Sequence, residues 1–176
     1  MLKALMKSMR LIVVLLLSLV LAKRVFADSP FLPEPLEKCL KPSSLQVQVT
    51  LVSTRNPFYL RGDFDADGRP DYAVVVRVKE TGKEALVICR SAGRAVLLGG
   101  RADAKQAFSS NEGDDFVAKN WEVLTAAEVR KLTSFASNVP RPLPNQVGDA
   151  IAMIFEDAVE LVYWDGRQFR HAPAHF

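Results

Sequence analysis

The residues best suited to chemistry are four aspartates grouped around one glycine. They are Asp63, Asp65, Asp67 and Asp71, with Gly68 at the point where the chain must turn. Oxygen ligands at this spacing wrap a hard cation, and they suit Ca²⁺ better than Mg²⁺, which prefers fewer carboxylates. Without a cation or protons, the four carboxylates repel one another. The alternative is a polar turn without metal, in which the carboxylates accept hydrogen bonds from backbone amides.

The spacing is similar to the first three quarters of an EF-hand loop, but the rest of that motif is missing. Position twelve, where an EF-hand supplies a bidentate glutamate, is Val74, and no amphipathic helix precedes Asp63. The aspartate at position nine is followed at once by a β-branched run. We therefore do not expect an EF-hand.

Residues 62–76 resemble instead the calcium loop of FG-GAP and VCBS repeats, a DxDxDGxxD hairpin of integrin-type propeller blades. The resemblance implies five Ca²⁺ ligands: the carboxylates of Asp63, Asp65, Asp67 and Asp71 and the main-chain carbonyl of Arg69. The loop occurs once, whereas a propeller needs at least four blades, so no propeller is expected. The chain resembles small exported bacterial proteins with one such loop and a closing Tyr-Trp-Asp-Gly-x-x-Phe hairpin, here residues 163–169.

Residues 1–27 are predicted to be a signal peptide. Basic residues precede an apolar run from Leu11 to Ala22, and Ala27 ends a segment suited to cleavage. Twelve apolar residues are too few to cross a bilayer, so no stable membrane insertion is expected after cleavage. The segment carries five of the 23 Lys and Arg residues and none of the 20 Asp and Glu residues. Residues 28–176 therefore have 18 basic against 20 acidic residues, which argues against nucleic acid as a partner.

Cys39 and Cys89 are the only cysteines, and export would bring both into an oxidising compartment. A disulfide between them is predicted, and two separate buried thiols are the alternative. At 149 residues, the segment 28–176 has the size of one domain.

Alternating and β-branched runs predict strands, and one segment predicts a helix. Thr125 and Glu128 have the spacing of a capping box, so a helix is expected from Thr125 to about residue 136. Strands are expected in these ranges: 45–51, 72–79, 85–90, 95–98, 150–155, 159–164 and 168–171. Asp165-Gly166 is expected to form a type I′ turn. The pattern predicts an α+β fold, a mainly antiparallel sheet of six or seven strands in meanders and hairpins with one packed helix.

The chain is poor in catalytic candidates. His171 and His175 have Pro173 between them, so they cannot lie on one helix face as a zinc-binding pair. Paired carboxylates for glycoside hydrolysis remain open among the following residues: Glu112, Asp114, Asp115 and Asp157. An aromatic binding surface also remains open, against ordinary packing, for these residues: Phe58, Tyr59, Trp121, Tyr163 and Trp164.

The sequence therefore predicts a periplasmic or secreted binding or structural module with a calcium-stabilised β-hairpin loop. Its partner is expected to be a protein or glycan of the cell envelope. The alternatives are a small secreted hydrolase, or an inhibitor of a cell-envelope enzyme that acts through the proline-rich segment 139–144.

Overall fold

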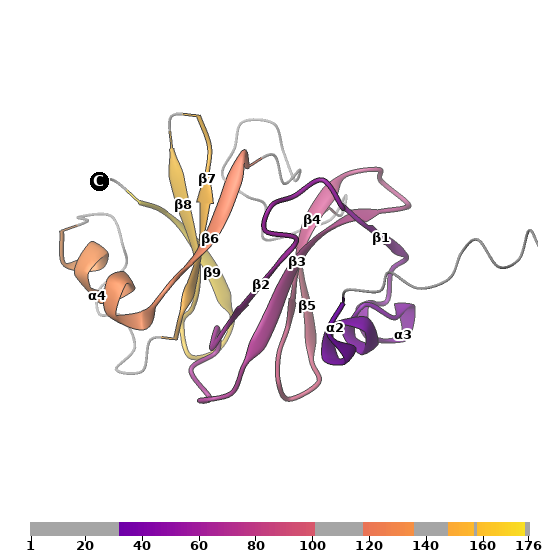
Figure 1. The fold of residues 1–176 in the computed structure, drawn as a ribbon, viewed down its shortest axis with the longest axis horizontal. Coiled ribbons are helices and arrows are strands. Elements are labelled where there is room, and N and C mark those ends of the chain that lie inside the picture. Colours follow the sequence, from indigo (N-terminus) through magenta and orange to yellow (C-terminus); the bar gives the residue numbers. More distant parts are fainter. Residues whose placement is uncertain (1–31, 101–117, 136–147, 157, 175–176) are drawn as a thin grey trace, which may run out of the picture. The chain divides into compact units, whose positions relative to one another are not determined.

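A computed structural model describes residues 32–100, 118–135, 148–156 and 158–174. The chain divides into two units, residues 1–32 and 33–176, and the second unit is described here by itself (Figure 1). Several predicted features lie outside the described residues: the signal peptide 1–27, the segment 139–144, the acids at 112, 114, 115 and 157, and His175.

Two antiparallel sheets form the fold. The first contains β1 (Val49–Leu51), β2 (Tyr59–Gly62), β3 (Asp71–Val78), β4 (Glu84–Cys89) and β5 (Ala95–Gly99). Its order is β1-β3-β4-β5, and β2 also pairs with β3, next to β1 on the same edge. The second contains β6 (Asn120–Leu124), β7 (Ala150–Ile154), β8 (Val159–Trp164) and β9 (Phe169–Ala174), paired in chain order. The predicted α+β class with a mainly antiparallel sheet is confirmed.

The main core lies between the two sheets. Alternate residues of the strands point into it, as the period of two requires. From the first sheet and its loops come Val52, Leu60, Phe64, Ala73, Val75, Leu86, Ile88 and Leu98, and from the second come Trp121, Ile151, Met153, Val162 and Phe169. Phe64 belongs to the aspartate-rich loop and is 1% exposed, so the loop is anchored in this core.

Helix α4 (Ala126–Phe135) packs against the other face of the second sheet. Its Val129 contacts Ala150, Tyr163 and Ala172 in a separate buried cluster. The predicted capping box is present, because Glu128 accepts hydrogen bonds from the amide and the hydroxyl of Thr125 at 2.8 and 2.7 Å.

The predicted disulfide joins Cys39 and Cys89, with 5.8 Å between their Cα atoms. It connects α2 (Glu34–Cys39) to the end of β4, next to the small helix α3 (Pro42–Leu45). The chain-entropy account gives about 4 kcal/mol for a loop of this length.

Three local predictions were wrong. Leu45 ends α3 and Gln46 has a left-handed φ of 60°, so the expected strand 45–51 is confined to β1. The strands divide into two sheets, because β6 pairs with β7 and not with β5. In the β8–β9 turn, Gly166 has positive φ, at 92°, but Asp165 does not, so the predicted type I′ turn with positive φ at both residues does not form.

Candidate metal centre

The aspartate-rich loop connects β2 to β3. Gly62 and Asp71 are paired at the base of this hairpin, so the loop begins and ends at a fixed separation. Ala66 and Gly68 both have left-handed φ, at 60° and 79°, and these two residues reverse the chain direction. The predicted β-hairpin loop is therefore present at the predicted residues.

Three of the four predicted carboxylates converge. One oxygen each from Asp63, Asp65 and Asp71 lies within 4.8 Å of the other two, and this group could hold a metal ion. Asp65 and Asp71 are buried, at 6% and 0% exposure, whereas Asp63 is half-buried. Hard oxygen donors of this kind favour Ca²⁺, Mg²⁺ or Mn²⁺ over softer metals.

Asp71 also organises the loop backbone. Its Oδ2 accepts hydrogen bonds from the amides of Phe64 and Asp65 at 3.0 and 3.2 Å, and its Oδ1 accepts one from the Ser91 amide at 2.6 Å. Asp63 accepts from the amides of Asp67 and Gly68, each at 3.0 Å. The amide-capping interactions of a polar turn therefore coexist with the converging carboxylates.

Asp67, a predicted ligand, is not among the three converging carboxylates. The carboxylate of Asp67 is exposed and accepts hydrogen bonds from the Ser91 hydroxyl at 2.7 Å and from the Arg69 amide at 2.8 Å. The hydrogen bond from Ser91 is the main reason why the pKa of Asp67 is lowered. The roles predicted for Asp67 and for the Arg69 carbonyl stay predictions.

Burial and crowding act on the protonation of Asp71. The pKa of Asp71 is raised to about 6, mainly by burial; the neighbouring charges of Asp65 and Asp67 contribute to the rise, while hydrogen bonds from the Ser91 and Asp65 amides oppose it. The group therefore favours either a proton or a cation.

Arg90 is a residue of this site that sequence analysis missed. Its Nε pairs with Asp65 Oδ2, and the Asp65 side chain is fully buried in this contact. The guanidinium also lies 4.5 Å from the ring centroid of Trp164 in the β8–β9 hairpin. Arg90 directly follows β4, where a basic residue has no signal that would relate it to an acidic loop 25 residues earlier.

Asp149 and Gly148 are also part of the site, and they also escaped prediction. Asp149 Oδ2 accepts a hydrogen bond from the Asp63 amide at 3.0 Å, and its own amide donates to the Asp63 carbonyl at 2.8 Å. Asp149 Oδ1 accepts from the amide of Ala126, the first residue of α4, at 3.1 Å. A Cβ on Gly148 would lie 2.3 Å from the Asp63 carbonyl oxygen. The segment that leads into β7 of the second sheet therefore contacts the loop backbone directly.

The predicted aromatic surface does not form as a single patch. Trp121 is 1% exposed in the core and donates from Nε1 to the Pro57 carbonyl at 2.8 Å, and Tyr163 is 6% exposed near α4. Trp164 remains partly exposed. His171, in β9, lies 3.9 Å from Glu160 and thus in a different pair from the one considered with His175.

No family model matches this sequence, and comparisons with curated proteins and with solved structures give no match. Among the described residues, no helix has the length and apolar character needed to cross a membrane.

Proposed function

We propose that the protein is an exported binding or structural module of the periplasm or the extracellular space, and that its β2–β3 loop binds Ca²⁺. The observation that carries this proposal is the convergence of Asp63, Asp65 and Asp71 in one loop. The resemblance of residues 62–76 to FG-GAP and VCBS loops favours calcium among the hard cations.

The surroundings of the loop favour a structural ion. Two of the three carboxylates are buried, and the amide and the carbonyl of Asp63 are both hydrogen-bonded to Asp149, which directly precedes β7 of the second sheet. An ion bound by Asp63, Asp65 and Asp71 would fix the loop at the point where the two sheets meet. Ion binding there would therefore stabilise the contact between the sheets.

Export is supported by the Cys39–Cys89 disulfide, because disulfides persist in oxidising compartments. A signal peptide at residues 1–27 would account for delivery, with cleavage before Asp28. A protein or glycan of the cell envelope is the proposed partner, and neither nucleic acid nor stable membrane insertion is part of the proposal.

Thermal unfolding in calcium and in chelator tests the metal. Extracellular calcium modules have dissociation constants of about 10⁻⁴–10⁻³ M, so 10 mM Ca²⁺ should stabilise the fold by about 1.4–2.7 kcal/mol. For a chain of this size, that corresponds to a rise in Tm of roughly 3–10 °C. An equal rise in 10 mM Mg²⁺ would exclude calcium selectivity, and an unchanged Tm in both ions would exclude the site.

A matched pair of variants locates the effect. Asp63→Asn keeps one acceptor oxygen but removes a proposed ligand charge, so the calcium-dependent rise should fall to less than half. Asp165→Asn removes the same charge from the β8–β9 turn and should leave the rise unchanged. Equal responses of the two variants would mean that calcium acts elsewhere.

A further inference from the structure

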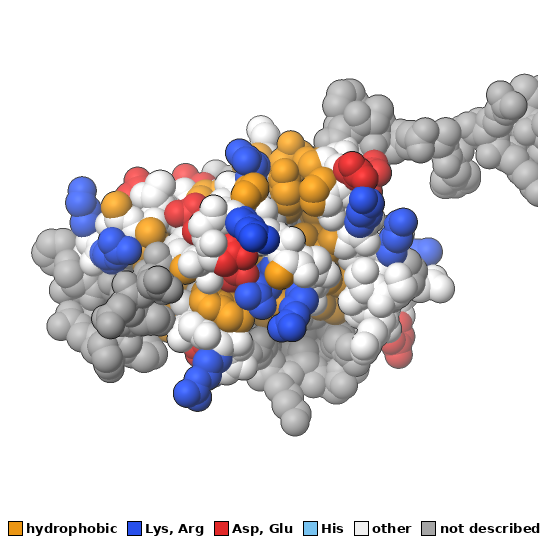
Figure 2. Space-filling model, turned by 90° about the horizontal axis from the view of Figure 1, so that it is seen from below, with side chains coloured by type: hydrophobic (Ala, Val, Ile, Leu, Met, Phe, Trp, Pro, Cys, Tyr) orange, Lys and Arg blue, Asp and Glu red, His pale blue; other side chains and the backbone are white. Residues whose placement is uncertain are grey.

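A second site lies close to the loop, in a hollow of about 700 Å³. Three connections come together at this end of the molecule: the β2–β3 loop, the β4–β5 turn and the β8–β9 turn (Figure 1). The hollow is bounded by the last two of these turns and by α3. In Figure 2, which looks onto this end, Lys and Arg side chains lie beside exposed hydrophobic side chains.

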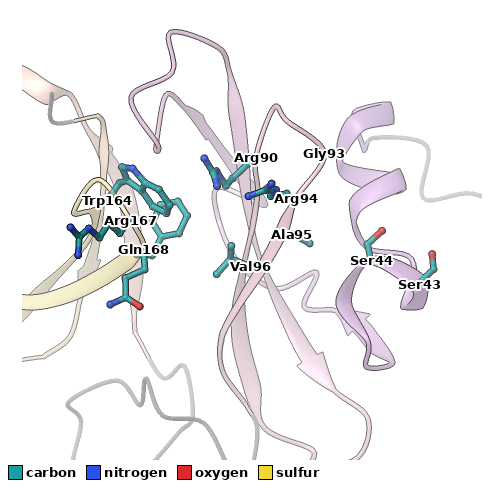
Figure 3. A pocket seen from close by; sticks show the side chains of 11 residues that line it. Ser43, Ser44, Arg90, Gly93, Arg94, Ala95, Val96, Trp164, Arg167 and Gln168 are labelled. Carbon is teal, nitrogen blue, oxygen red and sulfur yellow. The ribbon is translucent and has the colours of Figure 1, made fainter.

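The hollow is basic. Arg90, Arg94 and Arg167 line it, and among the described residues that line it there is no acidic side chain. Arg90 is paired with Asp65, but Arg94 and Arg167 are exposed and form no ion pair within the described part of the chain. In Figure 3, Arg90 and Arg94 lie on one side, facing the turn that carries Trp164 and Arg167. Two guanidinium groups are thus available to an anionic ligand.

Guanidinium groups bind carboxylate and phosphate through paired hydrogen bonds, in a fixed planar geometry. The hollow is much larger than one such group, since its volume equals that of about 20 water molecules in the liquid. It lies in the size range of sites for whole small ligands. The ligand should therefore carry its anionic groups on a larger body.

The remaining residues that line the hollow indicate which chemical groups the rest of the ligand carries. Ser43 and Ser44 offer hydroxyl groups, and the partly exposed Trp164 offers an aromatic surface. The lining extends from α3 past the β4–β5 turn to the β8–β9 turn, which suits a chain-like ligand. Hydroxyl-rich rings with attached carboxylates or phosphates satisfy all of these groups.

We propose that this hollow binds an acidic glycan, with Arg94 and Arg167 contacting its carboxylate or phosphate groups. The inference rests on the binding role proposed above, of which it names the ligand class, but it does not depend on calcium. Arg90 has a positioning role, because its guanidinium is already paired with Asp65 and lies over Trp164.

Calorimetric titration of the full chain tests the proposal, in low salt and in chelator, so that loss of calcium cannot be mistaken for loss of the glycan. The probes are hexagalacturonate, neutral maltohexaose and inorganic phosphate. Hexagalacturonate should bind at least about tenfold more tightly than either of the others, because charge-assisted hydrogen bonds add to contacts with the sugar rings. Fluorescence gives a second readout, since Trp164 lines the hollow and Trp121 is buried.

Matched double variants separate the site from general charge. Arg94→Gln with Arg167→Gln should weaken hexagalacturonate binding about a hundredfold, at about tenfold for each guanidinium. Arg61→Gln with Lys79→Gln removes the same charge from exposed residues outside the hollow and should weaken binding less than about threefold.

Four results would overturn the proposal. Equal weakening by the two double variants would show non-specific attraction, and equal binding of maltohexaose would show that charge is not recognised. Phosphate binding as tightly as hexagalacturonate would show that the sugar is not recognised. Absence of hexagalacturonate binding up to millimolar concentration would also overturn it, whatever the outcome of the calcium melt.

Discussion

The β2–β3 loop and the β8–β9 turn are built from the same chemistry and differ in burial. In both regions, an aspartate accepts hydrogen bonds from backbone amides and forms an ion pair with an arginine. The pairs are Asp65 with Arg90 in the loop and Asp165 with Arg170 in the turn. The side chain of Asp65 is fully buried, whereas that of Asp165 is 24% exposed. Water can replace a lost partner in the turn but not in the loop. The comparison predicts that equal substitutions have unequal effects.

The largest difference should come from removing one carboxylate in each region. Asp71→Ala leaves three backbone amides without their acceptor in a buried loop and should destabilise the fold by about 4 kcal/mol. Asp165→Ala removes the acceptor of two amides near solvent and should cost about 1 kcal/mol. Urea unfolding in chelator measures both. Asp71→Asn, which keeps one acceptor, should fall between them, and equal losses would contradict the comparison.

The second largest difference in stability should come from removing the arginine of each ion pair. Arg90→Gln leaves Asp65 buried without its cation and should cost about 3 kcal/mol, at the lower end for buried pairs because the arginine is 18% exposed. Arg170→Gln should cost less than about 1 kcal/mol, since its side chain is 52% exposed.

Adding calcium to the arginine variants gives a further test of the proposed ion. If an ion binds beside Asp65, its charge should recover at least half of the loss caused by Arg90→Gln and none of the loss caused by Arg170→Gln. Urea midpoints in 10 mM Ca²⁺ and in chelator measure the recovery. Similar recovery in both variants would argue against an ion at the loop.

The smallest difference in stability should come from substituting one glycine in each region. Gly148→Ala forces a Cβ against the Asp63 carbonyl, and backbone must move, at a cost of about 2–3 kcal/mol. Gly166→Ala meets no atom within 4 Å, so only its left-handed φ opposes the substitution, at about 1 kcal/mol. Thermal unfolding of the two variants measures the difference, and a larger loss for Gly166→Ala would refute the close contact between loop and second sheet.

Local patterns predicted most strands and failed where pairing is distant in the sequence. The β-branched runs of β3 and β4 and the capping box at Thr125 are read from neighbouring residues. The four residues of β2 are too few for a reliable period, and no strand was predicted for β6, although Trp121 and Val123 alternate with polar Asn120 and Glu122 there. Division into two sheets depends on partners that no local period specifies.

The residues of the candidate site also fall into two groups, those that local sequence predicted and those that it did not. Asp63, Asp65 and Asp71 were predicted because the loop motif is contiguous. Arg90 and Asp149 were not, because they come 25 and 86 residues after the aspartates that they contact. Their roles arise when the β4–β5 turn and the start of β7 are brought to the loop by packing of the core.

The Asp149 side chain also sets an order of assembly. While the chain emerges in the N-to-C direction, the β2–β3 hairpin can close as soon as β3 is available, since its pairing is local. The Asp63 amide and carbonyl must wait for residue 149, and so must the Ala126 amide at the start of α4. These hydrogen bonds of the loop and the helix can therefore form only after residue 149 has emerged.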